Sequence, residues 1–87
     1  MRLTIVPGDK TVIVDGERRE VDCSALHSCD GIHAVQWDGL AGHEEWVQSG
    51  LPYKSNTPLS SVDKYADVVA AWNAAPPPPT SPSMQLT

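Results

Sequence analysis

The amino-acid sequence predicts an α+β domain: a small antiparallel β-meander of two hairpins and about five strands, one C-terminal amphipathic helix, and an extended Pro-rich tail. Three observations support this fold class. Short runs rich in β-branched residues come first, turn signals separate them, and the clearest helical periodicity comes last. Strands that precede a helix, without alternation between the two, favour an antiparallel sheet over βαβ units.

The first hairpin is predicted near the N-terminus. Residues 2–6 alternate in polarity, and the Thr-Val-Ile-Val run at 11–14 favours a strand because its residues are β-branched. The PGDK sequence at 7–10 predicts a turn, and the Asp-Gly pair at 15–16 is typical of a tight hairpin. Residues 17–22 then return as a more polar third strand, whose charges indicate a sheet edge.

The second hairpin is predicted from the IHAVQW run at 32–37. The turn DGLAG follows at 38–42, and residues 43–47 form the return strand. We expect Trp37 and Trp46 to lie near each other across this hairpin, where an aromatic pair would add about 0.5–1.5 kcal/mol beyond burial.

A helix is predicted over residues 60–73, after a connector at 48–58 that contains two prolines. Its apolar residues are spaced by three, four and three positions, which places them on one face. The prolines at 76–79 end the helix. The stripe consists of Val62, Tyr65, Val69 and Trp72.

The chain divides into a small α+β domain at 1–75 and a Pro-rich extended C-terminal tail at 76–87. The tail contains five prolines and few apolar residues, so it cannot bury enough surface to offset the entropy of ordering it. A domain of this size buries only roughly 60% of its unfolded surface and often gains stability from a partner.

The charge pattern argues against nucleic acid as a partner. The net charge is −5, and Arg18 and Arg19 are flanked by Glu17 and Glu20. Phosphate neutralisation requires concentrated Lys and Arg.

The chain also lacks an apolar run long enough for a membrane span, and the run at its start is too short for a signal peptide. We expect a soluble protein made in a cytosol, with no membrane partner.

A Cys/His-rich segment lies between the two hairpins. Cys23, His27, Cys29 and His33 follow the spacing C-x3-H-x-C-x3-H, with His43 further along. All are possible zinc ligands, but the spacing departs from the usual structural zinc patterns, so we expect no metal. A Cys23–Cys29 disulfide would close a very small loop, and the missing secretion signal favours a polar segment with two free thiols.

The sequence predicts a protein that is not an enzyme and needs no cofactor. It contains no nucleophile elbow, no phosphate-binding glycine loop and no metalloprotease motif. Glu44 and Glu45 are adjacent on a predicted strand, so their side chains point to opposite faces and cannot act as a facing acid and base.

Partner contacts are predicted at Trp46 and in the tail. Trp46 is the candidate exposed aromatic anchor, although tryptophan in a small domain usually belongs to the core. The tail favours polyproline II and contains P-x-x-P, so it is either a solvated extension or an arm that reaches another subunit. The candidate contact residues in the tail are Pro77, Pro78, Met84 and Leu86.

Three sequence features resemble small tail-fibre-associated proteins of tailed bacteriophages. They are the opening LTIVP, the VIVDG hairpin and the IHAVQW strand, followed by a helical segment that ends near Trp72-Asn73. The resemblance covers about residues 1–75 and excludes the tail. It implies a structural or assembly protein of the tail fibre or baseplate region, found in the virion tail and in the host cytoplasm during assembly.

The resemblance also implies which partners to expect. They are other phage tail proteins and further copies of the chain itself, contacted through strand edges, aromatic residues and the C-terminal arm. The alternative is a small host adaptor module that binds a peptide or partner protein through its aromatic hairpin. The resemblance assigns no role to the Cys/His segment.

Overall fold

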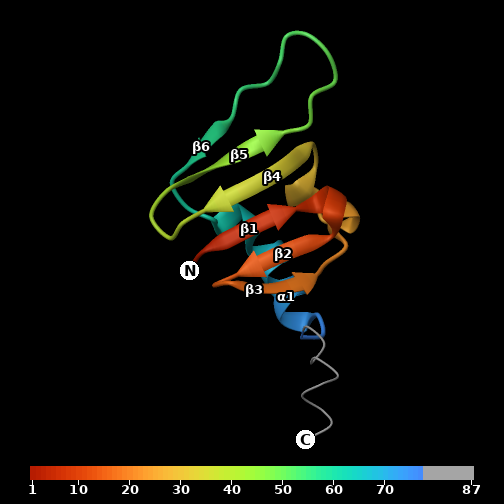
Figure 1. Cartoon of the computed structure of the whole chain (residues 1–87), viewed down its shortest axis with the longest axis vertical. Helices are drawn as coiled ribbons and strands as arrows, with labels where there is room; N and C mark the ends of the chain where they lie inside the picture. Colours follow the sequence, from red (N-terminus) through yellow and green to blue (C-terminus); the bar gives the residue numbers. More distant parts are fainter. Residues whose placement is uncertain (78–87) are drawn as a thin grey trace, which may run out of the picture.

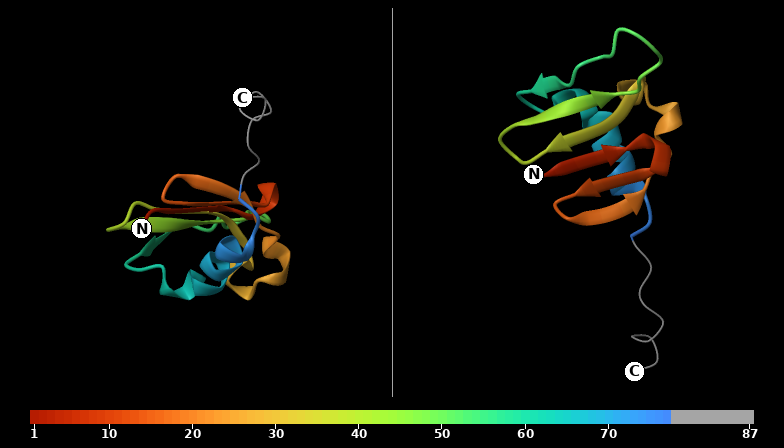
Figure 2. Two further views of the ribbon diagram at one scale, coloured as in Figure 1. Left: turned by 90° about the horizontal axis from the view of Figure 1, so that it is seen from below. Right: turned by 45° about the horizontal axis from the view of Figure 1, so that its top comes forward.

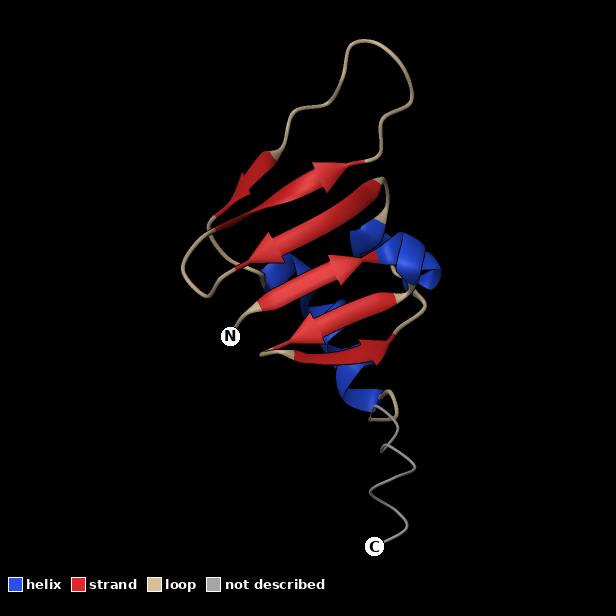
Figure 3. Ribbon diagram, in the orientation of Figure 1, coloured by secondary structure: helices blue, strands red, loops and turns tan. Residues whose placement is uncertain are grey.

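The computed structural model describes residues 1–77 and contains one antiparallel sheet of six strands with one short helix (Figures 1 and 3). The expected α+β class is confirmed, but the expected count of five strands is wrong. The spatial order of the strands is β3-β2-β1-β4-β5-β6. Their bounds are β1 Leu3–Val6, β2 Thr11–Val14, β3 Glu17–Glu20, β4 Ile32–Trp37, β5 Gly42–Trp46 and β6 Thr57–Leu59.

The predicted turns of the first hairpin are present. Asp15 and Gly16 both adopt positive φ, at 49° and 87°, as the tight turn between β2 and β3 requires. In the preceding turn Lys10, rather than Gly8, takes the left-handed conformation, with φ of 51°. The backbone N–H of Arg2 donates to Oδ1 of Asp15 at 2.8 Å and ties the start of β1 to this turn.

The expected Trp37–Trp46 pair is not formed. Trp37 lies opposite Gly42, whereas Trp46 lies opposite Ile32, so the two rings stand at opposite ends of the second hairpin. The reason is the register of the two strands. The short turn places Gly42 opposite Trp37, so Trp46, four residues further along β5, lies opposite Ile32 at the far end of β4. A register shift between Ile32 and Ala34 also turns Ile32 into the core while His33 is exposed.

The sixth strand lies where a connector was expected at 48–58. Residues Thr57–Leu59 pair with β5, with Pro58 opposite His43. A strand of three residues is too short to show an alternating pattern, and its proline argues against a strand in the sequence. Proline is tolerated here because β6 is an edge strand. On the side away from β5 its backbone forms no hydrogen bonds to another strand, so the missing N–H of proline costs little.

The helix begins later than residues 60–73 predict. A 3₁₀ turn, η4 (Asp63–Tyr65), precedes α1 (Ala66–Ala74). Val62 and Tyr65 have ψ near 18° and 19°, outside regular helix, so the two segments meet at an angle. The most buried residues of this region are Tyr65 and Val68, while Val69 and Trp72 are only partly buried.

The helix α1, η4 and the 3₁₀ turns within residues 23–29 cover one face of the sheet (Figure 2), whereas the 3₁₀ turn Pro7–Asp9 joins β1 to β2 at the end of the sheet. We call this the covered face, and it holds the hydrophobic core. The opposite, open face is not covered by any element within residues 1–77 (Figure 2). The core consists of Leu3, Ile5, Val12, Val14, Val21, Cys23, Cys29, Ile32, Val35, Tyr65 and Val68.

Both edges of the sheet carry features that oppose pairing with another strand. The edge strand β3 has the sequence Glu-Arg-Arg-Glu, as the predicted polar edge requires. The other edge strand, β6, is short and contains Pro58, which lacks an N–H. Charges, proline and short length are common protections of sheet edges. Contacts through strand edges are therefore less suited to this fold than the sequence suggested.

Candidate partner-binding surface

The most prominent exposed apolar feature is the connection between β5 and β6, which we call the β5–β6 loop (residues 47–56). It extends well beyond the end of the sheet (Figure 1). Val47, Leu51 and Tyr53 are 52%, 81% and 71% exposed, respectively. Three large apolar side chains on one projecting loop are costly to leave in water and suit contact with another protein.

The base of this loop is held by one side chain. The Gln48 amide nitrogen donates to the carbonyl oxygens of Trp46, at 3.1 Å, and Lys54, at 2.9 Å. The Lys54 N–H in turn donates to Oε1 of Gln48, at 2.8 Å. These three bonds close the loop near the sheet, so its apolar tip is presented from a defined base and loses less entropy on binding than a free segment.

Trp46 lies at this base as a partly buried residue that packs against the core. Its indole N–H donates to Oγ1 of Thr57 at 2.8 Å, and the Lys54 ammonium lies 5.3 Å from the ring centroid. A Cβ at Gly31 would lie 3.7 Å from the ring. The predicted anchor is thus a support for the loop, and the more exposed apolar residues lie further along it.

The charge of the loop differs from that of the rest of the protein. Residues 47–56 contain one charged residue, Lys54, whereas the whole chain carries −5. An apolar loop of low charge on an acidic body suits an apolar recess of a partner rather than a polyanion. Tyr is also an efficient contact residue, because it buries a large area with few rotatable bonds and is enriched among residues that dominate binding energy.

The open face has a shallow hollow of about 450 Å³ near the N-terminal end of β1. In its floor, Oγ1 of Thr4 and Oε1 of Gln36 lie 3.2 Å apart on neighbouring strands. Nearby, Nε2 of His43 lies 2.8 Å from Oε2 of Glu45. The hollow mixes polar groups with the apolar side chains of Ile13 and Trp37. It is a second surface of mixed chemistry and is open to a protein or a small polar molecule.

The one buried carboxylate of the described core belongs to Glu44, which is 2% exposed. Its Oε2 accepts a bond from Nζ of Lys64 at 2.5 Å and another from the Tyr65 hydroxyl. Burial, together with this bond to Glu44, raises the pKa of Tyr65. Glu45 projects from the open face, so the prediction that the adjacent glutamates face opposite ways is confirmed.

We interpret the Glu44 cluster as a structural network. The charge of the carboxylate is compensated by the Lys64 ammonium, and the tyrosine supplies a further donor. Both donors come from η4, so the network fixes this turn onto strand β5. The sequence did not indicate it, because Glu44 lies 20 residues before Lys64.

The Cys/His segment separates its thiols from its imidazoles. Cys23 and Cys29 are buried free thiols, whereas the side chain of His27 is fully exposed and His33 is exposed on β4. Within residues 1–77, no group of three or more His, Cys, Asp or Glu side chains is placed to hold a metal ion. Burial raises the pKa of Cys29 from 9.0 to about 12 and also raises that of Cys23.

The predicted contact residues of the tail fall largely outside the described chain. Pro77 is exposed just after the helix. Pro78, Met84 and Leu86 lie beyond residue 77, outside the described residues. Among residues 1–77, no helix has the length and apolar character required to cross a bilayer.

Sequence reasoning missed the β5–β6 loop as a candidate surface. The segment has neither strand nor helix periodicity, and it lies almost wholly within residues 48–58, whose two prolines indicate a connector only. The available signal was the presence of Val47, Leu51 and Tyr53 in a stretch with almost no charge.

Comparison of the chain with protein-family models, with curated proteins and with solved structures finds no match.

Proposed function

We propose that this protein is a structural or assembly protein of a bacteriophage tail, in the tail-fibre or baseplate region. It acts by contacts with other tail proteins and not by catalysis. The observation that carries the proposal is the sequence pattern LTIVP, VIVDG and IHAVQW, which resembles small tail-fibre-associated proteins. On this proposal the protein works in the host cytoplasm during assembly and belongs to the virion tail.

The β5–β6 loop supports a binding role. Leu51 and Tyr53 are largely exposed, and Gln48 holds the base from which they project. A partner with an apolar recess would remove both side chains from water, and burial of one such side chain contributes about 1.5–3 kcal/mol. We therefore propose that the loop is the main contact with the tail partner.

The polar groups of the core support binding over catalysis. Glu44 is held between Lys64 and Tyr65 under η4, and so it is engaged in holding the fold. The Cys29 thiol has its pKa raised to about 12, so it carries little thiolate near neutral pH. These groups are therefore poorly suited to act as base or nucleophile in the state that the structure describes.

Co-expression with neighbouring gene products tests the proposal. The chain is expressed with the tail-fibre or baseplate protein encoded beside it, with the affinity tag on that partner. The expected result is a complex that survives gel filtration with a fixed stoichiometry measured by light scattering. The proposal fails if the chain elutes alone as a folded monomer with every tail-fibre and baseplate protein encoded nearby.

A further inference from the structure

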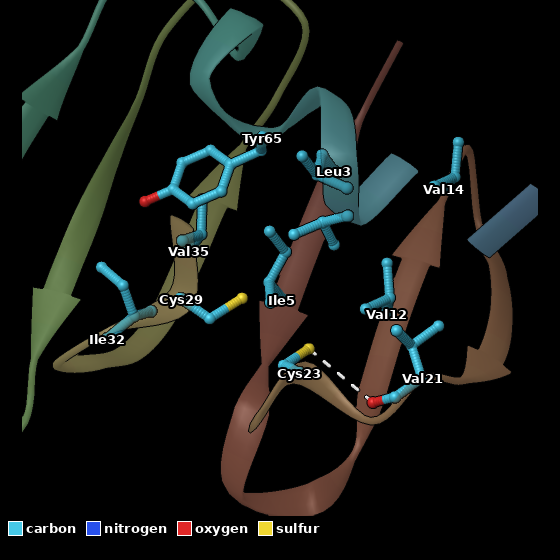
Figure 4. Packing of buried hydrophobic residues seen from close by; sticks show 11 residues of the cluster. Leu3, Ile5, Val12, Val14, Val21, Cys23, Cys29, Ile32, Val35 and Tyr65 are labelled. Atoms are coloured by element: carbon cyan, nitrogen blue, oxygen red, sulfur yellow. Dashed lines mark hydrogen bonds between the residues drawn. The ribbon is translucent and has the colours of Figure 1, made fainter. Parts of the chain in front are cut away.

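Two buried thiols lie in the segment that joins β3 to β4. Cys23 and Cys29 are 2% and 7% exposed. Their side chains lie in the same part of the core (Figure 4), and the pKa of each thiol is affected by the other. The Cys23 thiol also lies 3.7 Å from the carbonyl oxygen of Val21. Two cysteines that are six positions apart are thus brought into one core cluster by the fold.

We propose that Cys23 and Cys29 are a reversible oxidation site. They form an intramolecular disulfide by thiol–disulfide exchange with a low-molecular-weight disulfide such as oxidised glutathione, which acts as the oxidant. For this bond the two sulfur atoms must come to about 2 Å from each other. The proposal concerns the folded chain itself and does not depend on the proposed tail function.

The backbone between the two cysteines can make this adjustment. It consists of two short 3₁₀ turns, η2 (Cys23–Ala25) and η3 (His27–Cys29), with Leu26 extended between them. One backbone bond of 3.0 Å closes η2, from Leu26 N–H to the Cys23 carbonyl. Two hold η3, from Cys29 N–H to the Leu26 carbonyl at 3.0 Å and from Asp30 N–H to the His27 carbonyl at 3.1 Å. The segment lies outside the ladder of the sheet, so a small shift does not disturb strand pairing.

A path to the thiols is also present. A surface hollow of about 490 Å³ is lined by both Cys23 and Cys29, together with Lys10 and Gly31. Asp22 and Asp30 also line the hollow and offset the charge of Lys10, so its size rather than its charge admits a small disulfide such as oxidised glutathione. Because Cys29 is the more exposed of the two, we assign the first attack to it.

The reaction balances as two successive thiol–disulfide exchanges. Cys29 loses its proton, and its thiolate attacks one sulfur of oxidised glutathione, which releases one glutathione thiol and leaves a mixed disulfide. The Cys23 thiolate then attacks Sγ of Cys29 and releases the second glutathione thiol. The two protein thiols are oxidised to one disulfide, and the disulfide of the oxidant is reduced to two thiols. Burial keeps both cysteines protonated near neutral pH, so the exchange is slow there and faster at higher pH.

The expected consequence is a more stable protein. A disulfide restricts the unfolded chain, and for a loop this small we expect the melting temperature to rise on the order of 5–10 °C. A phage particle leaves the reducing cytosol at lysis, so the disulfide would form after assembly. This last consequence alone rests on the proposed tail function.

Intact-mass analysis of the full chain tests the site. The reduced protein is incubated with oxidised glutathione, then unfolded and treated with iodoacetamide. We expect a monomer that has lost two hydrogen atoms, accepts no alkyl group, and regains two alkylation sites after dithiothreitol. Trypsin should leave both cysteines in one peptide, residues 20–54, which contains the bond.

Variants and side products decide the interpretation. Cys23→Ala and Cys29→Ala should each give no intramolecular disulfide, and the wild-type readout stands even where a variant folds poorly. The proposal is overturned if the folded wild type keeps two alkylatable thiols at pH 8.5 while the urea-unfolded chain oxidises. A stable glutathione adduct or an intermolecular dimer as the main product would overturn it equally.

Discussion

Arg19 of the edge strand β3 stacks on Trp72 of helix α1, with the guanidinium carbon 3.9 Å from the ring centroid. The same guanidinium donates to the carbonyl oxygens of Trp72, at 3.0 Å, and Ala75, at 3.2 Å. In return, the indole N–H of Trp72 donates to the carbonyl of Glu17 at 3.1 Å. One arginine therefore closes the C-terminal end of the helix and attaches it to the sheet edge.

This relationship predicts that Arg19→Ala destabilises the protein. The loss of the cation–π contact and of two charge-assisted bonds to helix carbonyls should lower the free energy of unfolding by about 1.5–3 kcal/mol. Glu20→Ala, an exposed position on the same strand, is the control and should change it by less than about 0.5 kcal/mol. Urea unfolding followed by tryptophan fluorescence measures both, and equal effects of the two variants would contradict the role of Arg19.

The Glu44 network predicts a cost for removing the hydroxyl of Tyr65. Tyr65→Phe leaves the buried carboxylate with Lys64 as its remaining side-chain donor, and should cost about 1–3 kcal/mol of unfolding free energy. Tyr53→Phe is the control, because Tyr53 is 71% exposed on the β5–β6 loop, and it should be neutral. Thermal or urea unfolding at pH 7 compares them; a neutral Tyr65→Phe would show that the hydrogen bond contributes nothing to stability.

The buried thiols predict a loss of stability at alkaline pH. The pKa of Cys29 is about 12 in the folded protein against an ordinary value of 9.0. Above pH 9 the unfolded chain therefore releases a proton that the folded chain retains, which favours unfolding by up to about 1.4 kcal/mol per pH unit. The contribution of this group is fully present below pH 9 and is lost between pH 9 and about 12.

Urea unfolding in reducing buffer from pH 7 to 10.5 measures this dependence. Tyr65, whose pKa is also raised from its ordinary value of 10.0, should add to the decline above pH 10. Cys29→Ala should make the decline shallower between pH 9 and 10. An identical pH profile for the variant and the wild type would show that the thiol does not titrate differently in the two states.

The turn between β4 and β5 predicts a strict need for glycine at position 42. A Cβ there would lie 2.0 Å from the Gln36 carbonyl oxygen and 2.8 Å from Cα of Trp37, both of which belong to the backbone. Gly42→Ala must therefore displace the hairpin, and we expect a loss of at least about 2–4 kcal/mol. Gly8→Ala has open space within 4 Å and should be close to neutral. Melting temperatures of both variants test this, and a native-like Gly42→Ala would contradict the hairpin geometry.

The sequence predicted the fold class and most elements because their signals are local. The β-branched run at 11–14 and the Asp15-Gly16 turn determine the first hairpin through backbone preference alone. The strand β6 and the start of α1 were not predicted correctly, because both depend on tertiary contacts. Thr57–Leu59 forms a strand because its backbone pairs with that of β5. Tyr65 lies outside the regular helix, and its hydroxyl donates a hydrogen bond to Glu44.

The candidate surface was less predictable than the fold. Trp46 was selected by residue type, but the structure uses its ring to support the base of the β5–β6 loop. The alternative of an aromatic hairpin that binds a peptide stays a prediction, although Trp37 and Trp46 stand at opposite ends of β4 and β5 and do not form a pair. Exposure of Leu51 and Tyr53 depends on how far the loop projects, which a sequence without periodicity does not reveal.

The central claim is that the β5–β6 loop is the partner-binding surface, and the affinity of loop variants for the partner tests it most directly. Titration calorimetry measures the affinity of the chain for the tail-fibre or baseplate protein with which it copurifies. The double variant Leu51→Ser/Tyr53→Ser should weaken binding at least about 30-fold, since contact residues of this kind cost 2 kcal/mol or more, and leave the melting temperature unchanged. The control Leu40→Ser removes an apolar side chain that is 90% exposed in the turn between β4 and β5. This variant should bind as the wild type does. Wild-type affinity in the double variant would contradict the assignment of the loop as the partner-binding surface.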